Sequence, residues 1–168
     1  MNIVSQKQTN TSLDDFELYL DSLNGNRMKK EMEKLRRSKS SITLTQLKSI
    51  YQIGVKLYST MQLKEAEMVF LSYSVLSPYD HRGPGSLAAI YLEKKEYKKA
   101  LDILNTVKTY PTCNVDEVFL DISLCHYKLG EYTNSSMVFI IVKPENLNEF
   151  YLSRYQYLKK QLNPYIEC

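Results

Sequence analysis

Residues 87–101 read LAAIYLEKKEYKKAL, and the order of residues in this stretch decides the fold. Two small residues in an apolar run are followed by a charged turn, and a lone alanine stands in the next apolar run. The same order recurs, because Ala66 lies 34 residues before Ala100 and the triplet 130–132 (GEY) follows 95–97 (KEY) by 35 residues. A period near ~34 residues is that of the tetratricopeptide repeat, a helix–turn–helix unit.

Small residues stand where two helices of one hairpin would have to approach closely. Gly54, Ala88 and Ser123 hold this place in the first helices, and Ala66 and Ala100 hold it in the second helices. A bulky side chain there would push the helices apart. We therefore predict an all-α fold, an α-solenoid of three tetratricopeptide-like helical hairpins over residues 47–149. The predicted repeats span 47–80, 81–115 and 116–149.

The two ends of the chain are predicted to cover this solenoid, because terminal repeats have no neighbour to bury them. Residues 1–46 are expected to form an N-terminal helical arm, with one amphipathic helix stopping at Asn24-Gly25 and a second over 27–38. Residues 150–168 are expected to form a C-terminal capping helix and tail in the same domain, ending at Asn163-Pro164.

Composition places the chain among ordinary globular proteins. It has 168 residues, of which 43% are apolar and 24% charged, which suits a single domain with a real core. A run of eighteen apolar residues and a signal peptide are both missing from the sequence, so a cytoplasmic protein without stable membrane insertion is expected. The three cysteines lack the spacing of metal ligands and are interpreted as free thiols.

A second apolar stripe runs along the first helices, beside the stripe that packs inside the solenoid. At about 100° per residue, it holds three positions of each helix: Tyr51, Val55 and Tyr58; Gly85, Ala89 and Leu92; Leu120, Leu124 and Tyr127. First helices line the concave surface of such stacks. A row of tyrosines and aliphatics there suits an apolar extended peptide. The alternative is that these residues are buried against neighbouring helices.

Catalytic chemistry is not indicated by any motif. The chain has two histidines, and His126 beside Cys125 is not a nucleophile–base pair, because adjacent helix residues point about 100° apart. The stretch HRGPGS (81–86) lacks the Gly-Lys-Ser ending of a phosphate loop. We therefore predict a protein that is not an enzyme, with no catalytic residue, metal site or cofactor.

The repeats resemble the class II chaperones of bacterial type III secretion. The resemblance rests on IYQIGVKLYSTMQLKEAEMVF (50–70), on LSPYD (76–80) followed by GSLAAIY (85–91), and on EVFLDISLCHYKLGEY (117–132). It covers residues 47–142. It implies a cytoplasmic protein that holds a hydrophobic translocator subunit in its concave groove before export, and a helical N-terminal arm that contributes to a homodimer.

Several residues match groove positions of that family or their immediate supports. These are Tyr51, Val55, Tyr58, Leu63 and Phe70, with Leu124 and Tyr127. Together with Ala89, Leu92 and Leu120 from the apolar stripe, they form the predicted cargo-binding set. Met61 departs from the family pattern, because a turn glycine is usual at that place.

Other functions remain open at this stage. Small repeat proteins of the same secretion systems chaperone needle subunits or early export substrates. An adaptor or regulator could use the same groove on a folded complex, including a transcription activator. A nucleic-acid protein using the basic patch at 28–39 is a third hypothesis, but Glu31 and Glu33 interrupt that patch, which favours a solvated helix face and no nucleic-acid partner.

Overall fold

The computed structural model of the chain describes Lys30, Lys34 and residues 42–166. Most of the predicted N-terminal arm, and with it the predicted role in a homodimer, lies outside the described residues, as does Cys168. Lys30 and Lys34 are the described positions of the helix predicted over 27–38, and both are helical.

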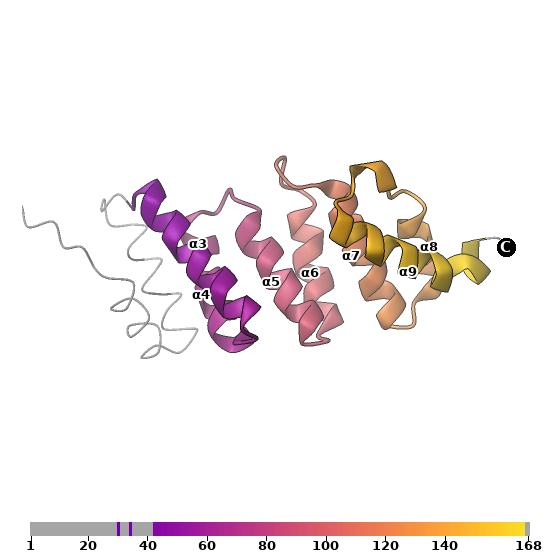
Figure 1. Cartoon of the computed structure of the whole chain (residues 1–168), viewed down its shortest axis with the longest axis horizontal. Coiled ribbons are helices and arrows are strands. Elements are labelled where there is room, and N and C mark those ends of the chain that lie inside the picture. The colour runs from indigo at the N-terminus through magenta and orange to yellow at the C-terminus, as the bar shows by residue number, and fades with distance from the viewer. Residues whose placement is uncertain (1–29, 31–33, 35–41, 167–168) are drawn as a thin grey trace, which may run out of the picture.

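Seven α-helices and one short 3-10 helix make up residues 42–166, and no β-strand occurs in this part of the chain. In order they are α3 (Leu44–Ser59), α4 (Leu63–Leu76), α5 (Arg82–Glu93), α6 (Tyr97–Val107), α7 (Val115–Lys128), α8 (Tyr132–Phe139), η1 (Pro144–Asn146) and α9 (Glu149–Ile166). From α3 to α8 each helix packs on the next (Figure 1). The predicted all-α stack of helical hairpins is confirmed.

The turn inside each hairpin contains one residue in the left-handed region of the backbone. The φ angles are 61° at Met61, 60° at Lys95 and 80° at Gly130, and these residues are one repeat apart. Glycine adopts this conformation without a steric cost, whereas a side chain adds about 1 kcal/mol of strain. The hairpin turn therefore has one geometry in all three repeats, and only the third repeat has the residue that suits it.

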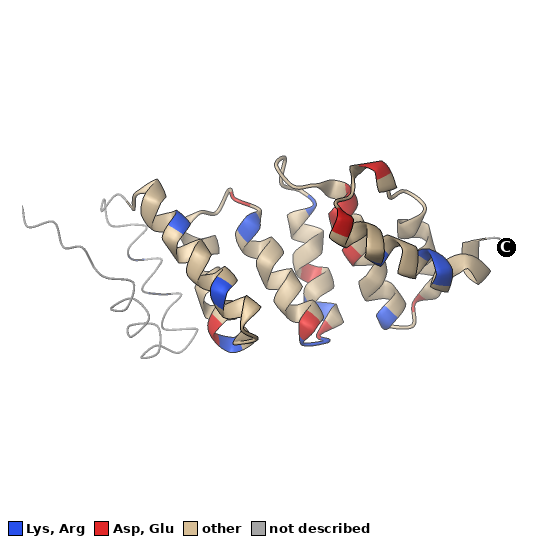
Figure 2. Cartoon of the chain, in the orientation of Figure 1, with Lys and Arg blue, Asp and Glu red and all other residues tan. Residues whose placement is uncertain are grey.

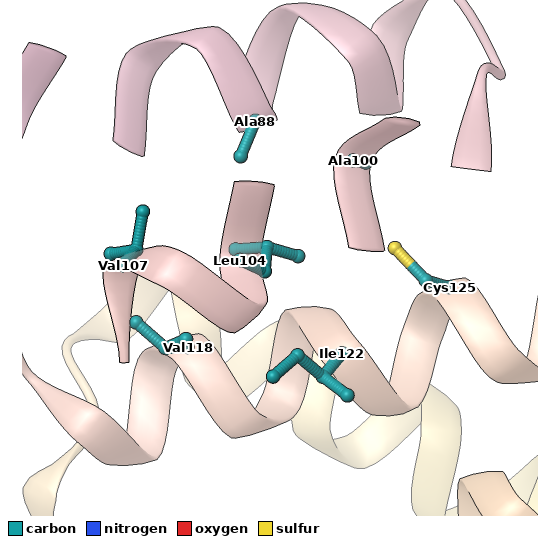
Figure 3. Close-up of a cluster of buried hydrophobic side chains, with 7 residues drawn as sticks. All are labelled: Ala88, Ala100, Leu104, Val107, Val118, Ile122 and Cys125. Atoms are coloured by element: carbon teal, nitrogen blue, oxygen red, sulfur yellow. The ribbon is translucent and has the colours of Figure 1, made fainter. Parts of the chain in front are cut away.

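Small residues are buried at the helix contacts, as the sequence predicts. Ala66 and Ala100 are both 0% exposed. Between the second and third hairpins, α5, α6 and α7 contribute one apolar cluster (Figure 3), formed by Ala88, Ala100, Leu104, Val107, Val118, Ile122 and Cys125. Burial raises the pKa of Cys125 to about 12, so this cysteine acts as a neutral core residue.

The third hairpin replaces the alanine contact with a pair of serines. Ser123 and Ser135 are both 0% exposed. The Ser135 hydroxyl donates to the Ser123 carbonyl at 2.8 Å, and the Ser123 hydroxyl donates to the Ser135 carbonyl at 3.0 Å. Each buried hydroxyl is therefore satisfied, and the two helices remain close.

The last helix, α9, caps the solenoid. Its Leu158 and Leu162 are fully buried against Leu120 and Phe139. Polar contacts to α7 add to this core, since Arg154 pairs with the carboxylate of Asp121. In the described part of the chain, no helix has the length and apolar character needed to cross a membrane.

One predicted boundary is wrong. The sequence predicts that the last helix stops at Asn163-Pro164, but α9 continues through Pro164 to Ile166. A proline removes the hydrogen bond to the carbonyl four residues earlier and crowds that carbonyl, but here only two residues of helix follow it. That carbonyl belongs to Lys160, which is exposed, so water can bind it.

Candidate functional site

The candidate site is the face formed by the first helices of the hairpins, α3, α5 and α7, with α9 lying across α7 (Figure 1). We call it the inner face. First helices line the concave surface in stacked helical hairpins. Of the ten predicted binding residues, eight come from these first helices and two, Leu63 and Phe70, come from α4.

Two tyrosines of α3 reach across to α5 at equivalent places. The hydroxyl of Tyr51 lies 3.4 Å from the hydroxyl of Ser86, and the hydroxyl of Tyr58 donates to Glu93 Oε1 at 3.4 Å. Each contact joins residues 35 positions apart, which is the repeat period. The tyrosines therefore form a wall that ties the first hairpin to the second.

Tyr51 is held more firmly than a free groove residue would be. Its ring centroid lies 5.6 Å from that of Phe70 and 5.2 Å from that of Tyr73. The Arg82 guanidinium lies over the Tyr51 ring, 5.2 Å from its centroid. Tyr51 is thus half-buried and contributes to the core of the first hairpin as well as to the inner face.

Both burial and surrounding charge act on the hydroxyl of Tyr58. Burial and then the neighbouring Glu93 raise the pKa of Tyr58, and the charges of Arg154 and Asp121 also act on it. Since Arg154 belongs to α9, these side chains from the first hairpin and from the cap face one region. The inner face therefore has α3 on one side and the α7–α9 pair on the other.

The floor between these sides is one ridge of α5, which is half-buried at Gly85 and Ala89 and exposed at Glu93. Gly85, Ala89 and Glu93 succeed one another at intervals of four residues, so they share one side of the helix. A Cβ built on Gly85 meets no atom within 4 Å, which shows open space above the glycine. Leu92 lies beside this ridge and is half-buried against the apolar cluster of α5, α6 and α7.

The far side consists of a buried ion pair and aromatic rings. Asp121 Oδ1 pairs with Arg154, and the Tyr151 hydroxyl donates to Asp121 Oδ2 at 3.3 Å. The Arg154 guanidinium lies 5.1 Å from the ring centroid of Phe150, and Phe150 is 65% exposed. Burial raises the pKa of Asp121 to about 6 against the opposing effect of Arg154.

The third hairpin offers less free surface than the sequence suggests. Leu120 is 0% exposed, and Leu124 and Tyr127 pack beside it against the α9 side of the core. The Tyr127 hydroxyl donates to Gln161 Oε1 of α9 at 3.0 Å. The expectation that Leu120 lines the surface is therefore corrected, because the capping helix covers it.

Some of the remaining predicted residues are exposed and others are buried. Val55 is 43% exposed on α3, whereas Phe70 is 1% exposed and lies beneath Gly54. Leu63 is half-buried in the cluster that contains Phe70. Phe70 and Leu120 can support the inner face only from below, and the part of every residue in cargo binding stays a prediction.

Two charged residues of the site, Glu93 and Arg154, are missing from the set predicted from the sequence. Glu93 continues the ridge of Gly85 and Ala89, and Arg154 comes from the cap. Glu93 could have been predicted from the sequence, because it follows Tyr58, a predicted site residue, by one repeat period. No comparable signal existed for Arg154, whose position depends on how α9 docks.

A metal centre is not indicated by the described side chains. Among residues 42–166 with Lys30 and Lys34, no group of three His, Cys, Asp or Glu side chains could hold a metal ion. Cys113 and Cys125 are free thiols in the same part of the chain. The chemistry available at the inner face is apolar contact, hydrogen bonding and ion pairing.

Comparisons with known proteins find a similarity of fold. No protein-family model matches the chain, and no curated protein matches it in sequence. Among solved structures, the chain is similar to the translocator chaperone SycD of the Yersinia enterocolitica type III secretion system, with a TM-score of 0.66 and 16% sequence identity. The match covers 79% of this chain and 93% of SycD. The chain therefore has the fold of a type III secretion translocator chaperone over nearly the whole length of that protein.

Proposed function

We propose that the chain is a chaperone of bacterial type III secretion. It binds an extended apolar segment of a hydrophobic translocator protein on its inner face, in the cytoplasm, and keeps that protein soluble and competent for export. The observation that carries this proposal is the similarity of fold to SycD over 93% of that chain.

The composition of the inner face supports a peptide as the ligand. Val55 and the open floor at Gly85 offer apolar contact to side chains of an extended segment. The tyrosine hydroxyls of α3 and the guanidinium of Arg154 offer hydrogen bonds to its main chain. Burial of apolar surface, worth about 25 cal/mol for each Å², supplies most of the binding free energy.

Chaperoning by this route needs no chemical step. The chaperone and its client form a stoichiometric complex, in which the apolar segment of the client is covered and cannot associate prematurely. A client that is released at the secretion machinery leaves the chaperone unchanged.

The floor of the inner face provides a sharp test. Gly85→Leu places a large side chain above α5, at a position where an added Cβ meets no atom within 4 Å. Gly85→Ala is the matched control, since it adds only one methyl group to the same position. The chain and each variant are co-expressed with the membrane-active translocator proteins of its own secretion system, and the soluble fraction of each translocator is measured.

The expected result is that one translocator is soluble with the parent and with Gly85→Ala but aggregates with Gly85→Leu. Equal solubility of every translocator with and without the chain would contradict the proposal. Binding to needle subunits or soluble regulators, with no effect of Gly85→Leu, would instead favour the related chaperone or adaptor functions.

A further inference from the structure

A carboxylate stands at the negative end of α5. Glu93 is the last residue of this helix and is exposed, and the last turn of α5 holds no basic residue. The free carbonyl groups at a helix C-terminus carry a partial negative charge, so a carboxylate is unfavourable there and a cation is favourable. The charge of Glu93 therefore adds to the negative end of the α5 dipole.

Two of three lysines near the C-terminal end of α5 are engaged elsewhere, and the third, Lys95, is exposed and follows the helix in its turn. Lys94 pairs with Glu67, and Lys99 pairs with Glu96. On the far side of the inner face, Arg154 is neutralised by Asp121. Glu93 forms no ion pair with any residue that the structure describes, and it accepts the Tyr58 hydroxyl at 3.4 Å.

Glu93 lies on the inner face, where a bound ligand could contact its carboxylate. It ends the ridge of Gly85 and Ala89, where the inner face is open, and α5 has no charge between Arg82 and Glu93. Figure 2 shows this uncharged middle of α5 between charged ends. A segment lying along the ridge would meet apolar floor first and the carboxylate at its end.

We infer that Glu93 binds a lysine or arginine side chain of the client, so that the inner face selects an extended apolar segment carrying one cation. This inference rests on the proposed function and deepens it. The pair would form beside the Tyr58 ring, where a bound segment excludes water and the interaction is stronger than at an open surface. Charge complementarity at this one position fixes the register of the segment on α5.

A peptide selection tests the inference without knowledge of the client. A phage-displayed library of random peptides about twelve residues long is panned on the full chain, on Glu93→Gln and on Glu93→Lys. Gln keeps the shape and the hydrogen bond of the side chain, whereas Lys reverses its charge. Melting temperatures confirm that the exposed substitutions leave the fold intact, and Gly85→Leu identifies the peptides that bind at the inner face.

The parent is expected to enrich apolar peptides with Lys or Arg at one fixed position, and Glu93→Lys is expected to enrich Asp or Glu there. For the best parent peptide, replacement of its cation by Met should weaken binding to the parent about tenfold and leave binding to Glu93→Gln unchanged.

Two other outcomes would overturn the inference, and they are distinguishable. Apolar peptides without a charge preference, lost in Gly85→Leu, would leave the proposed function intact and show that Glu93 selects nothing. If the parent enriches no peptide at the inner face, the proposed function and the inference fail together.

Discussion

Gly54→Ala should destabilise the protein, although replacement of glycine by alanine within a helix ordinarily stabilises it. Gly54 is buried in the middle of α3. A Cβ built there would lie 2.7 Å from Cε1, 2.8 Å from Cζ and 3.0 Å from Cδ1 of Phe70. Real Cβ atoms do not approach other atoms so closely, so either the ring or the helix must move.

The surroundings of Phe70 prevent an easy retreat. The side chain is 1% exposed, and the ring of Tyr51 packs on it at a centroid distance of 5.6 Å. Overpacking of a core costs about 1–3 kcal/mol, and the better helix propensity of alanine returns about 1 kcal/mol. We expect a net loss of about 1 kcal/mol in the free energy of unfolding.

Urea denaturation followed by circular dichroism measures this loss as a lower midpoint at an unchanged slope. Gly85→Ala is the matched control, because it makes the same substitution in a helix where an added Cβ meets no atom within 4 Å. The control should be as stable as the parent or slightly more stable. If Gly54→Ala were as stable as Gly85→Ala, the close approach of α3 and α4 that we describe would be incorrect.

Three further predictions concern the turns, one ion pair and the tyrosine wall. Met61→Gly and Lys95→Gly should each stabilise the protein by about 0.5–1 kcal/mol in the same urea assay, because both residues have positive φ; a loss of stability would show that their side chains matter more than this strain. Hydrogen bonds from Arg82 hold the pKa of Asp80 well below its usual range, so Asp80 stabilises the fold above about pH 4. This contribution disappears as the pH falls through the folded-state pKa, and Asp80→Asn should therefore be less stable than the parent at pH 7, with a difference that shrinks in urea titrations at lower pH. Tyr51→Ala should lower the free energy of unfolding by about 2 kcal/mol, because the ring packs against two other aromatic rings; a melting temperature equal to that of the parent would show that Tyr51 is only a surface residue.

The fold could be predicted because its determinants recur along the chain. Ala66 and Ala100 mark the same helix contact one repeat apart, and both are fully buried. The third repeat departs from this pattern, since Ser135 stands where the first two repeats have alanine. Two mutually bonded serines keep the helices close there, so a polar residue fills a place that the pattern reserves for an apolar one.

The sequence predicts a site residue correctly only where the position of that residue on its own helix determines whether it is exposed. Val55 and Tyr58 reach the inner face because their angular positions on α3 place them there. Leu120 has a similar angular position on α7 but is covered, since α9 packs on it. Helical periodicity predicts on which side of its own helix a residue lies. It cannot predict whether a helix later in the chain packs against that side and buries the residue.

The cover that Leu120 receives from α9 also bears on synthesis at the ribosome. Contacts in the first two hairpins join residues close in sequence, so each hairpin can bury its core soon after it is translated. The third hairpin has to wait for Leu158 and Leu162, which lie more than thirty residues after Leu120. During that interval the nascent chain presents bare apolar surface, so a chain that ends between α8 and α9 is expected to aggregate.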